Sequence, residues 1–264
     1  MTHQTVVAQG LVVPCYNEAF RLDVQQFERL IDHAPGLQLF VVDDGSTDNT
    51  RAVLGALQRA RPGRVHLMVN GSNQGKAEAV RRGLSRALEA GCPIVGFLDA
   101  DLAAPVDEVV RLLGQMRESD CDALLGSRVR LLGRQIERNE IRHYLGRAFA
   151  TAVSLVLRLG VYDTQCGLKL FRRTPSLEAA LAEPFMSRWV FDVELLSRLM
   201  RGPFALEAHR IHEEPLHSWC DISRSKLRPS HMLGAGVDLV RIAWRGHQRA
   251  RGGGGPRKAM APRS

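Results

Sequence analysis

The stretch IVGFLDAD, residues 94–101, decides the fold that we expect for this chain. An apolar run that ends abruptly in polar residues is typical of a strand covered on both faces of a parallel sheet. Two carboxylates one residue apart at the end of such a strand can bind an oxygen-preferring cation and leave positions for substrate phosphates. We therefore predict that Asp99 and Asp101 hold a divalent metal. An additional role for Asp101, as the cap of a helix that begins near Pro105, is compatible with this prediction.

The same alternation of apolar runs and longer helical stretches extends on both sides of this segment. It is typical of parallel strands joined by crossover helices. The predicted strands are residues 11–15, 37–42, 65–69, 94–98 and 123–126, followed by 168–171 and 204–212. The predicted helices are residues 24–33, 50–60, 75–90, 106–119, 140–159 and 190–200. We therefore predict an α/β protein with a single Rossmann-like, mostly parallel sheet flanked by helices.

Acidic residues collect where three of the predicted strands end. They are Glu18, Asp43, Asp44, Asp99 and Asp101. Ligands of open α/β sheets bind outside the carboxyl ends of the strands, so these groups are expected at one edge. Because clustered carboxylates repel one another, the edge predicts a cation together with a nucleobase or ribose. We assign Asp44 to a nucleotide contact; the alternative is that the two neighbouring aspartates only form a turn and cap the next helix.

Other nucleotide-binding classes fit poorly. No Gly-x-Gly-x-x-Gly follows the first strand, which disfavours a dinucleotide oxidoreductase. The segment GSNQGK at 71–76 departs from a P-loop in the spacing of its glycines and in the Ala77 that follows. The five cysteines are scattered without metal-ligand or redox spacing, and we expect them to be reduced.

The positive charge of the chain is concentrated at one end. The formal net charge is +8, yet residues 241–264 contain seven basic and no acidic residues, which leaves residues 1–240 nearly neutral. We predict one catalytic domain over 1–240 and a basic, disordered tail over 241–264. A near-neutral domain without an extended basic stripe argues against a nucleic-acid partner. The sequence contains no long apolar run and no signal-peptide pattern, so we expect a cytoplasmic protein.

Taken together, the motifs resemble family 2 glycosyltransferases with the GT-A fold. The later motifs resemble the polyprenyl-phosphate branch of that family, which includes dolichyl-phosphate glucosyltransferases and mannosyltransferases. The matching segments are VVPCYNE (12–18), VDDGSTD (42–48), NQGKAEAVRRGL (73–84), LDAD (98–101), GSR (126–128), DTQCGLKLF (163–171), RWVFDVELL (188–196) and a weaker W-x-x-x-S-x-S-K-L at 219–227. The resemblance spans about residues 11–227.

The resemblance implies a role for each matching position. The residues implied at the nucleotide-sugar donor are Pro14, Tyr16, Glu18, Asp43, Asp44, Lys76, Ala100 and Lys226. Asp99 and Asp101 would hold Mg²⁺ or Mn²⁺ against the diphosphate, and Arg128 would reach the phosphates. Arg138 and Arg142 would meet the phosphate of the acceptor. Lys226 is the weakest of these assignments, because Arg224 stands in a segment where the family has glycine before Ser-Lys-Leu.

The activity that the resemblance implies is transfer of a hexose, glucose from UDP-glucose, to a polyprenyl phosphate, with inversion at the anomeric carbon. An acceptor that is already an anion needs no general base, whereas a hydroxyl acceptor would require a carboxylate. Asp192 is the candidate for that base, and a structural or acceptor-positioning role is its alternative. Transfer to a hydroxyl of a saccharide or metabolite, use of GDP-mannose, and a non-catalytic nucleotide-sugar sensor remain the competing hypotheses.

Two segments are candidates for peripheral attachment to the cytoplasmic face of a membrane. Apolar residues and arginines within 145–161 are consistent with a helix at a bilayer interface, and the alternative is a helix packed on its own sheet. The basic tail is the second candidate, because basic residues near an anionic lipid surface contribute about 1 kcal/mol each. Its alternative is a solvated terminus.

Overall fold

A central seven-stranded sheet organises the chain. The computed structural model describes residues 7–245, except 138–139, 202–203, 221–233 and 235; the side chains of 137, 140–145 and 148 are likewise outside the description. The strands are β1 (Gln9–Cys15), β2 (Leu37–Asp43), β3 (Val65–Val69), β4 (Ile94–Leu98), β5 (Ala123–Ser127), β6 (Gln135–Glu137), β7 (Leu168–Arg172), β8 (Ile211–Pro215) and β9 (Ser218–Cys220). The large sheet has the order β3-β2-β1-β4-β7-β5-β8, and β6 pairs with β9 in a separate ribbon.

All strands of the large sheet run in one direction except β7. β1 pairs in parallel with β2 and β4, β2 with β3, and β5 with β8, whereas β7 is antiparallel to both of its neighbours, β4 and β5. Because β1, β2 and β4 are parallel neighbours, the loops that leave their carboxyl ends meet at one edge of the sheet. The predicted α/β class and mostly parallel sheet are confirmed.

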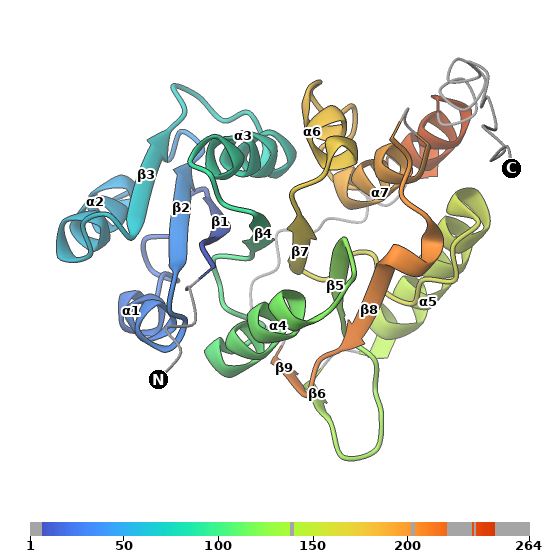
Figure 1. The fold of residues 1–264 in the computed structure, drawn as a ribbon, viewed down its shortest axis with the longest axis horizontal. Coiled ribbons are helices and arrows are strands. Elements are labelled where there is room, and N and C mark those ends of the chain that lie inside the picture. The colour runs from blue at the N-terminus through green and yellow to red at the C-terminus, as the bar shows by residue number, and fades with distance from the viewer. Residues whose placement is uncertain (1–6, 138–139, 202–203, 221–233, 235, 246–264) are drawn as a thin grey trace, which may run out of the picture.

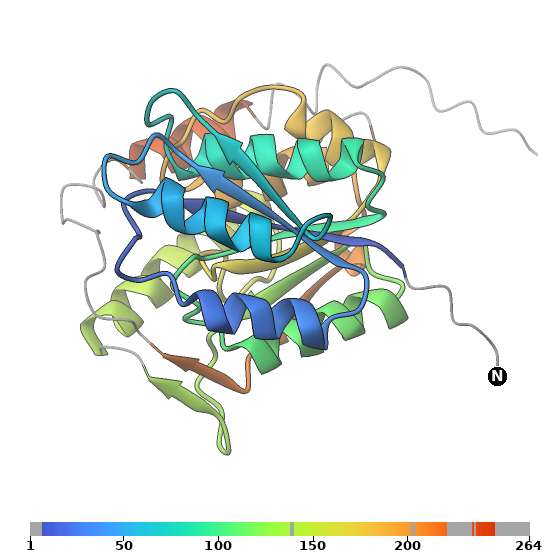
Figure 2. The ribbon, with the colours of Figure 1, turned by 90° about the vertical axis from the view of Figure 1, so that its left-hand side faces the viewer.

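Helices cover both faces of the sheet (Figures 1 and 2). The helices are α1 (Val24–His33), α2 (Thr50–Ala60), α3 (Lys76–Glu89), α4 (Val106–Glu118), α5 (Glu140–Leu157), α6 (Pro175–Leu181) and α7 (Phe191–Arg201), with a short 3-10 helix at Ala208–Arg210. Apolar residues of α1, α2 and α4 form one core with the sheet. Those of α3, α5, α6, α7 and a helical segment at 236–245 form the core of the other face. The two cores fix the sheet, and thus the edge where the loops meet.

Most predicted elements agree with the structure to within two residues. The strand predicted at 204–212 is wrong: it begins only at Ile211 and continues to Pro215. Its extent is set by pairing with β5, where Ala123 lies opposite Ile211 and Ser127 opposite Pro215. Helix α6 was not predicted, although Thr174 accepts a hydrogen bond from the Leu177 N–H as its N-cap and Pro175 opens the helix.

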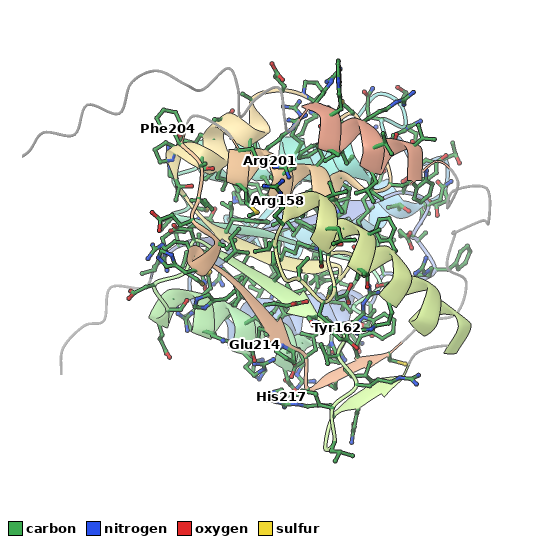
Figure 3. All side chains as sticks on the ribbon, turned by 90° about the vertical axis from the view of Figure 1, so that its right-hand side faces the viewer. Arg158, Tyr162, Arg201, Phe204, Glu214 and His217 are labelled. Atoms are coloured by element: carbon green, nitrogen blue, oxygen red, sulfur yellow. The ribbon has the colours of Figure 1, made fainter. Side chains whose placement is uncertain are left out.

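Helix α5 packs against the body of the protein. Val153 and Leu157 are buried in the second core, while Leu155 is 75% exposed. Arg147 of the same helix lies over the ring of Tyr162, 4.0 Å from its centroid, and Figure 3 shows Tyr162 beside this helix. The described side chains therefore support the alternative for 145–161, a helix packed on its own sheet, over a helix at a bilayer interface.

The helical segment at 236–245 crosses residue 240, the predicted end of the catalytic domain. Ile242 is buried in the second core, so at least this part of the predicted tail packs on the domain. Residues 246–264 lie outside the described residues, and the basic tail remains a prediction. Four of the cysteines are buried and all five are free, as expected. Within the described ranges, no helix has the length and apolarity that crossing a bilayer requires.

Candidate active site

The loops after β1 and β2 are held together by side-chain hydrogen bonds. The Asn17 N–H donates to Ser46 Oγ at 3.0 Å, and the Glu18 N–H donates to Thr50 Oγ1 at 2.8 Å. In return, the Thr47 N–H donates to Asn17 Oδ1 at 2.8 Å. The motifs VVPCYNE and VDDGSTD are therefore one structural unit. It places the partly exposed Pro14 and Tyr16 at the edge of the sheet where donor binding was predicted.

Asp43, the last residue of β2, and Asp44, which follows it, face inward. Asp43 accepts a hydrogen bond from the Ser46 N–H at 3.0 Å. Both oxygens of Asp44 are occupied by the loop before α3: Oδ1 accepts from Asn70 Nδ2 at 2.7 Å and Oδ2 from the Gly75 N–H at 2.7 Å. Both aspartates are buried. Protein hydrogen-bond donors therefore hold both carboxylates in place, and convergence of all five acidic groups on a ligand stays a prediction. A nucleotide contact by Asp44 stays a prediction.

Glu18, Asp99 and Asp101 do come together, and two cations join them. Lys76 Nζ lies 2.5 Å from Asp99 Oδ1. Arg21 links the other two, with Nη2 at 2.8 Å from Asp101 Oδ2 and Nη1 at 3.2 Å from Glu18 Oε2. The side chains of Asp99 and Asp101 are 36% and 22% exposed, so the pair is open at the rim. This is the cluster that the sequence predicted at strand ends, with its repulsion offset by neighbouring cations.

The charges of this cluster shift one another's pKa values. Burial and the neighbouring Asp99 raise the pKa of the Asp101 carboxyl, against the opposing effects of the Ala103 N–H, Arg21 and Lys76. Partial burial lowers the pKa of the Lys76 ammonium, but the carboxylates of Asp99 and Asp192 outweigh this effect and raise it overall. Lys76 therefore stays protonated, as a cation beside a diphosphate would have to be.

Gly167 makes room for Asp99. The Asp99 N–H donates to the Gly167 carbonyl at 3.1 Å, and a Cβ added at Gly167 would lie 2.2 Å from Asp99 Oδ2. Only a residue without a side chain lets the carboxylate lie against this backbone. The backbone of the DTQCGLKLF motif thus packs against the Asp99 carboxylate. This contact depends on the pairing of β7 with β4.

The cluster fits Mg²⁺ or Mn²⁺. These cations prefer carboxylate oxygens and commonly use one or two carboxylates together with substrate phosphates. Asp99 and Asp101 offer such oxygens at the exposed edge of the sheet, and the absence of a side chain at Gly167 leaves space for the Asp99 carboxylate. In the part of the chain that the structure describes, no set of three or more His, Cys, Asp or Glu side chains is grouped to hold a metal. Further ligands would have to come from the substrate or from water.

Arg128 lies behind the cluster in a buried ion pair. Its Nε and Nη2 lie 2.6 and 2.8 Å from the two oxygens of Asp163, and its guanidinium lies over the ring of Trp219. Burial alone would raise the pKa of Asp163, but Arg128 holds it well below its usual range. Glu213 fixes this carboxylate in turn by accepting the N–H of Tyr162 and of Asp163. Contact of Arg128 with a phosphate stays a prediction.

Asp192 is the second residue of α7 and is buried. Its Oδ2 accepts from Gln165 Nε2 at 3.3 Å and lies 3.7 Å from Lys169 Nζ. Burial raises the pKa of the Asp192 carboxyl, with Lys169 and Lys76 opposing the shift. Ala100 is buried between the two rim aspartates. Of the remaining candidates, Arg138 and Lys226 and the side chain of Arg142 lie outside the described residues.

Sequence reasoning missed several charged residues of the site. They are Arg21, Asp163, Lys169 and Arg188. Arg188 Nη2 donates to Asn73 Oδ1 at 3.4 Å, and its guanidinium lies against Gly75, whose φ of 93° is in the region that favours glycine. Three of these residues lie inside motifs already quoted, but nothing in a motif shows which charge meets which across the fold.

The Arg128–Asp163 pair generates a stability prediction. Asp163→Asn leaves the Arg128 guanidinium buried without its counter-charge, so we expect a loss of about 3–5 kcal/mol in the free energy of unfolding at pH 7. Because the folded-state pKa of Asp163 is depressed, its contribution is present above the unfolded pKa of about 3.9 and fades as the pH falls below it. The difference between wild type and variant should therefore stay constant from pH 7 to about pH 5 and shrink as the pH falls further, through and below about 3.9, in urea unfolding experiments.

The matched control is Asp107→Asn, which removes an exposed pair with Arg29. An exposed pair contributes about 0–1 kcal/mol, so the control should unfold nearly as the wild type does. Equal losses for the two variants would contradict the importance of the buried pair.

The chain resembles known proteins over most of its length. A family model described as "Glycosyl transferase family 2" matches residues 11–178. A dolichyl-phosphate beta-glucosyltransferase from Trichomonas vaginalis is 32% identical over 252 residues, which covers 88% of this chain and 69% of that protein. The dolichyl-phosphate beta-glucosyltransferase of Homo sapiens is 32% identical over 254 residues, covering 89% and 75% of the two chains.

Among solved structures, glucosyl-3-phosphoglycerate synthase from Mycobacterium tuberculosis, in complex with Mn²⁺, UDP and glucosyl-3-phosphoglycerate, superposes with a TM-score of 0.66. It is 19% identical, and the match covers 91% of this chain and 80% of that one. At this identity the likeness concerns the fold, which is the GT-A fold expected from the sequence. The family match and the two relatives together show that this chain belongs to glycosyltransferase family 2.

Proposed function

We propose that this glycosyltransferase moves glucose from UDP-glucose to a polyprenyl phosphate, with inversion at the anomeric carbon. The proposal is supported by the names of the similar proteins, which are dolichyl-phosphate beta-glucosyltransferases from several organisms. The observation that carries it is the rim cluster: Asp99 and Asp101 open at the edge of the sheet, with Lys76 and Arg21 in contact with them.

The difficult step of such a transfer is departure of the nucleoside diphosphate. A divalent cation held by Asp99 and Asp101 would neutralise charge that develops on this leaving group. Lys76 supplies a second positive charge at the same place, and it is the first residue of α3. The amino end of a helix carries a partial positive charge, which favours an anion at this position. We infer that Lys76 turns from Asp99 to the diphosphate when the donor binds.

We propose a phosphate acceptor because the Asp192 carboxylate is buried and already engaged by other side chains. A hydroxyl acceptor would need a base within reach of its proton. Asp192 is buried, and its Oδ2 is engaged by Gln165 and Lys169. A phosphate monoester has a second pKa of about 6, so it is already a nucleophilic anion at neutral pH. It needs cations to position it, and we assign Arg138 and Arg142 to that task through bidentate pairing.

We also propose that the protein attaches to the surface of anionic membranes through the helical segment 236–245. Val237, Val240 and Trp244 are exposed and share one face of this helix, while Leu239 and Ile242 on the opposite face are buried in the protein. The exposed Arg241 and Arg245 flank the apolar face. This combination of outward apolar side chains and neighbouring arginines favours an anionic lipid surface.

The same helix lies near the proposed active site. Asp238 Oδ2 accepts a hydrogen bond from Ser187 Oγ at 2.7 Å, and the next residue, Arg188, contacts Asn73 just before α3. Figure 2 shows the segment at the end of the molecule toward which β1 runs, the end that bears the rim cluster. A lipid acceptor would therefore reach the rim cluster from a membrane lying against this helix.

The activity itself is tested with purified protein, Mn²⁺ and a panel of nucleotide sugars with a short polyprenyl phosphate, by mass analysis of the products. We expect a glucosylated lipid phosphate from UDP-glucose only. Asp99→Asn should lower the rate by about 100-fold or more, because removal of one group that stabilises a developing charge costs that much. A product from GDP-mannose, or from a saccharide hydroxyl without lipid phosphate, would replace this proposal with one of its alternatives.

Gly167→Ala tests the packing of the Asp99 carboxylate against residue 167 without removing any charge. The added methyl would displace the Asp99 carboxylate, and a displacement of about 1 Å at a reacting group can cost about 100-fold in rate. We expect kcat to fall while the circular dichroism spectrum stays unchanged. Gly160→Ala is the control, since a Cβ there meets no atom within 4 Å. Full activity in the Gly167 variant would mean that Asp99 needs no fixed position.

The double substitution Val240→Asp and Trp244→Asp tests membrane attachment. Each large apolar side chain buried in lipid contributes about 1.5–3 kcal/mol, so we expect binding to vesicles of phosphatidylcholine and phosphatidylserine to weaken at least about tenfold. Phe204→Asp is the control: Phe204 is also exposed, and Figure 3 shows it well away from this helix. Unchanged co-sedimentation of the double variant would contradict the assignment of the helix.

A further inference from the structure

Lys169 is a charged residue that the proposed reaction does not use directly. It lies on β7, opposite Phe97 of β4, and its side chain is completely shielded from solvent. A buried ammonium is strongly unfavourable unless it has a counter-charge and hydrogen-bond acceptors. A fully buried lysine between Leu168 and Leu170 of β7 therefore needs a specific reason to be there.

Its partners connect two sides of the active site. The Lys169 ammonium donates to the Cys166 carbonyl, lies 3.7 Å from Asp192 Oδ2, and lies over the ring of Phe97. Asp192 belongs to α7 and is the residue that the sequence offered as a base for a hydroxyl acceptor. Cys166 precedes Gly167, whose backbone supports Asp99. One ammonium thus touches both the α7 carboxylate and the backbone beneath the metal-binding carboxylate.

The position of the Asp192 carboxylate is determined by its contacts with Lys169 and Gln165 and not by solvent. Its Oδ1 is buried and accepts no hydrogen bond from the residues that the structure describes, while Oδ2 is shared by Lys169 and Gln165. Gln165 is the neighbour of Cys166, so one contact to Asp192 comes from the segment that leads into β7 and the other from Lys169 of β7 itself. Removing the ammonium would free this segment and the carboxylate together.

We propose that Lys169 is a positioning residue: through the Cys166 carbonyl and Asp192 it holds the 165–167 backbone so that Asp99 is placed for metal and diphosphate. This inference rests on the proposed function, because the choice of UDP as the nucleotide in the test comes from the proposed donor. It differs from a simple ion pair, in which Lys169 would only neutralise Asp192. The two possibilities separate when both charges are removed at once.

The test compares Lys169→Met, Asp192→Asn and the double variant with the wild type. Methionine keeps the length of the side chain without the charge, so Lys169→Met should lower the melting temperature by leaving Asp192 buried and unpaired. Asp192→Asn in the same chain removes that unpaired charge, and we expect it to restore most of the lost thermal stability. The double variant therefore reports on a folded protein even where the single variant fails to fold.

The decisive readout is metal-dependent nucleotide binding, measured by titration calorimetry with UDP in the presence and absence of Mn²⁺. We expect the gain in UDP affinity that Mn²⁺ produces to be about tenfold or more smaller in the double variant than in Asp192→Asn alone, because Asp99 is no longer held in place. Equal gains in these two variants would overturn the proposal and leave Lys169 as a counter-charge only. Absence of any thermal loss in Lys169→Met would overturn it as well.

Two controls complete the experiment. Arg173→Met, just beyond the end of β7, removes an exposed ion pair with Glu178 and a hydrogen bond to the Leu88 carbonyl, and it should leave the effect of Mn²⁺ unchanged. Titration with GDP in place of UDP separates this inference from the proposed donor. A wild type that binds only GDP would contradict UDP-glucose as the donor, and the comparison of variants would then be made with GDP.

Discussion

The packing of the Asp99 carboxylate against the backbone of Gly167 is the contact on which the site depends. It requires that β7 enter the sheet antiparallel between β4 and β5, so that the segment before β7 ends beneath the segment after β4. It also requires that residue 167 have no side chain. Once this contact is made, Asp99 and Asp101 face the rim, and Lys76 and Arg21 lie against them.

Charge compensation explains how so many ionised groups share one edge. The carboxylates that remain at the rim have arginine and lysine partners, whereas Asp43 and Asp44 are satisfied by backbone and amide donors of the loops that they support. Asp44 is therefore a brace for the loop before α3, and that loop sets the position of Lys76. Asp44 at the end of β2 thus influences the rim cluster by holding the backbone that positions Lys76.

A second layer of buried charges lies beneath the rim. Arg128 pairs with Asp163, and Lys169 pairs with Asp192. Buried pairs of this kind are weak contributors to stability compared with apolar packing, but breaking one of them is costly. Their value here lies in fixing geometry, because each pair joins segments that are distant in the chain and adjacent at the site. Preorganised charges of this kind are what stabilisation of a departing diphosphate requires.

The amino-acid sequence by itself determined the alternation of strands and helices, the parallel character of the sheet and the strand-end position of Asp99 and Asp101. These features depend on side-chain periodicity and on neighbours within a few residues, which a linear pattern records. The short β6–β9 ribbon and the true start of β8 escaped prediction, because their extent is set by pairing with distant strands.

Only the tertiary structure decided which charges meet: Arg21 with Asp101, Asp163 with Arg128, and Lys169 with Asp192. It likewise turned Asp43 and Asp44 inward and placed Gly167 under Asp99. The physical reason is that burial and electrostatic pairing act through space. Residues far apart along the chain become neighbours only when β7 pairs between β4 and β5, and no local sequence pattern records that pairing.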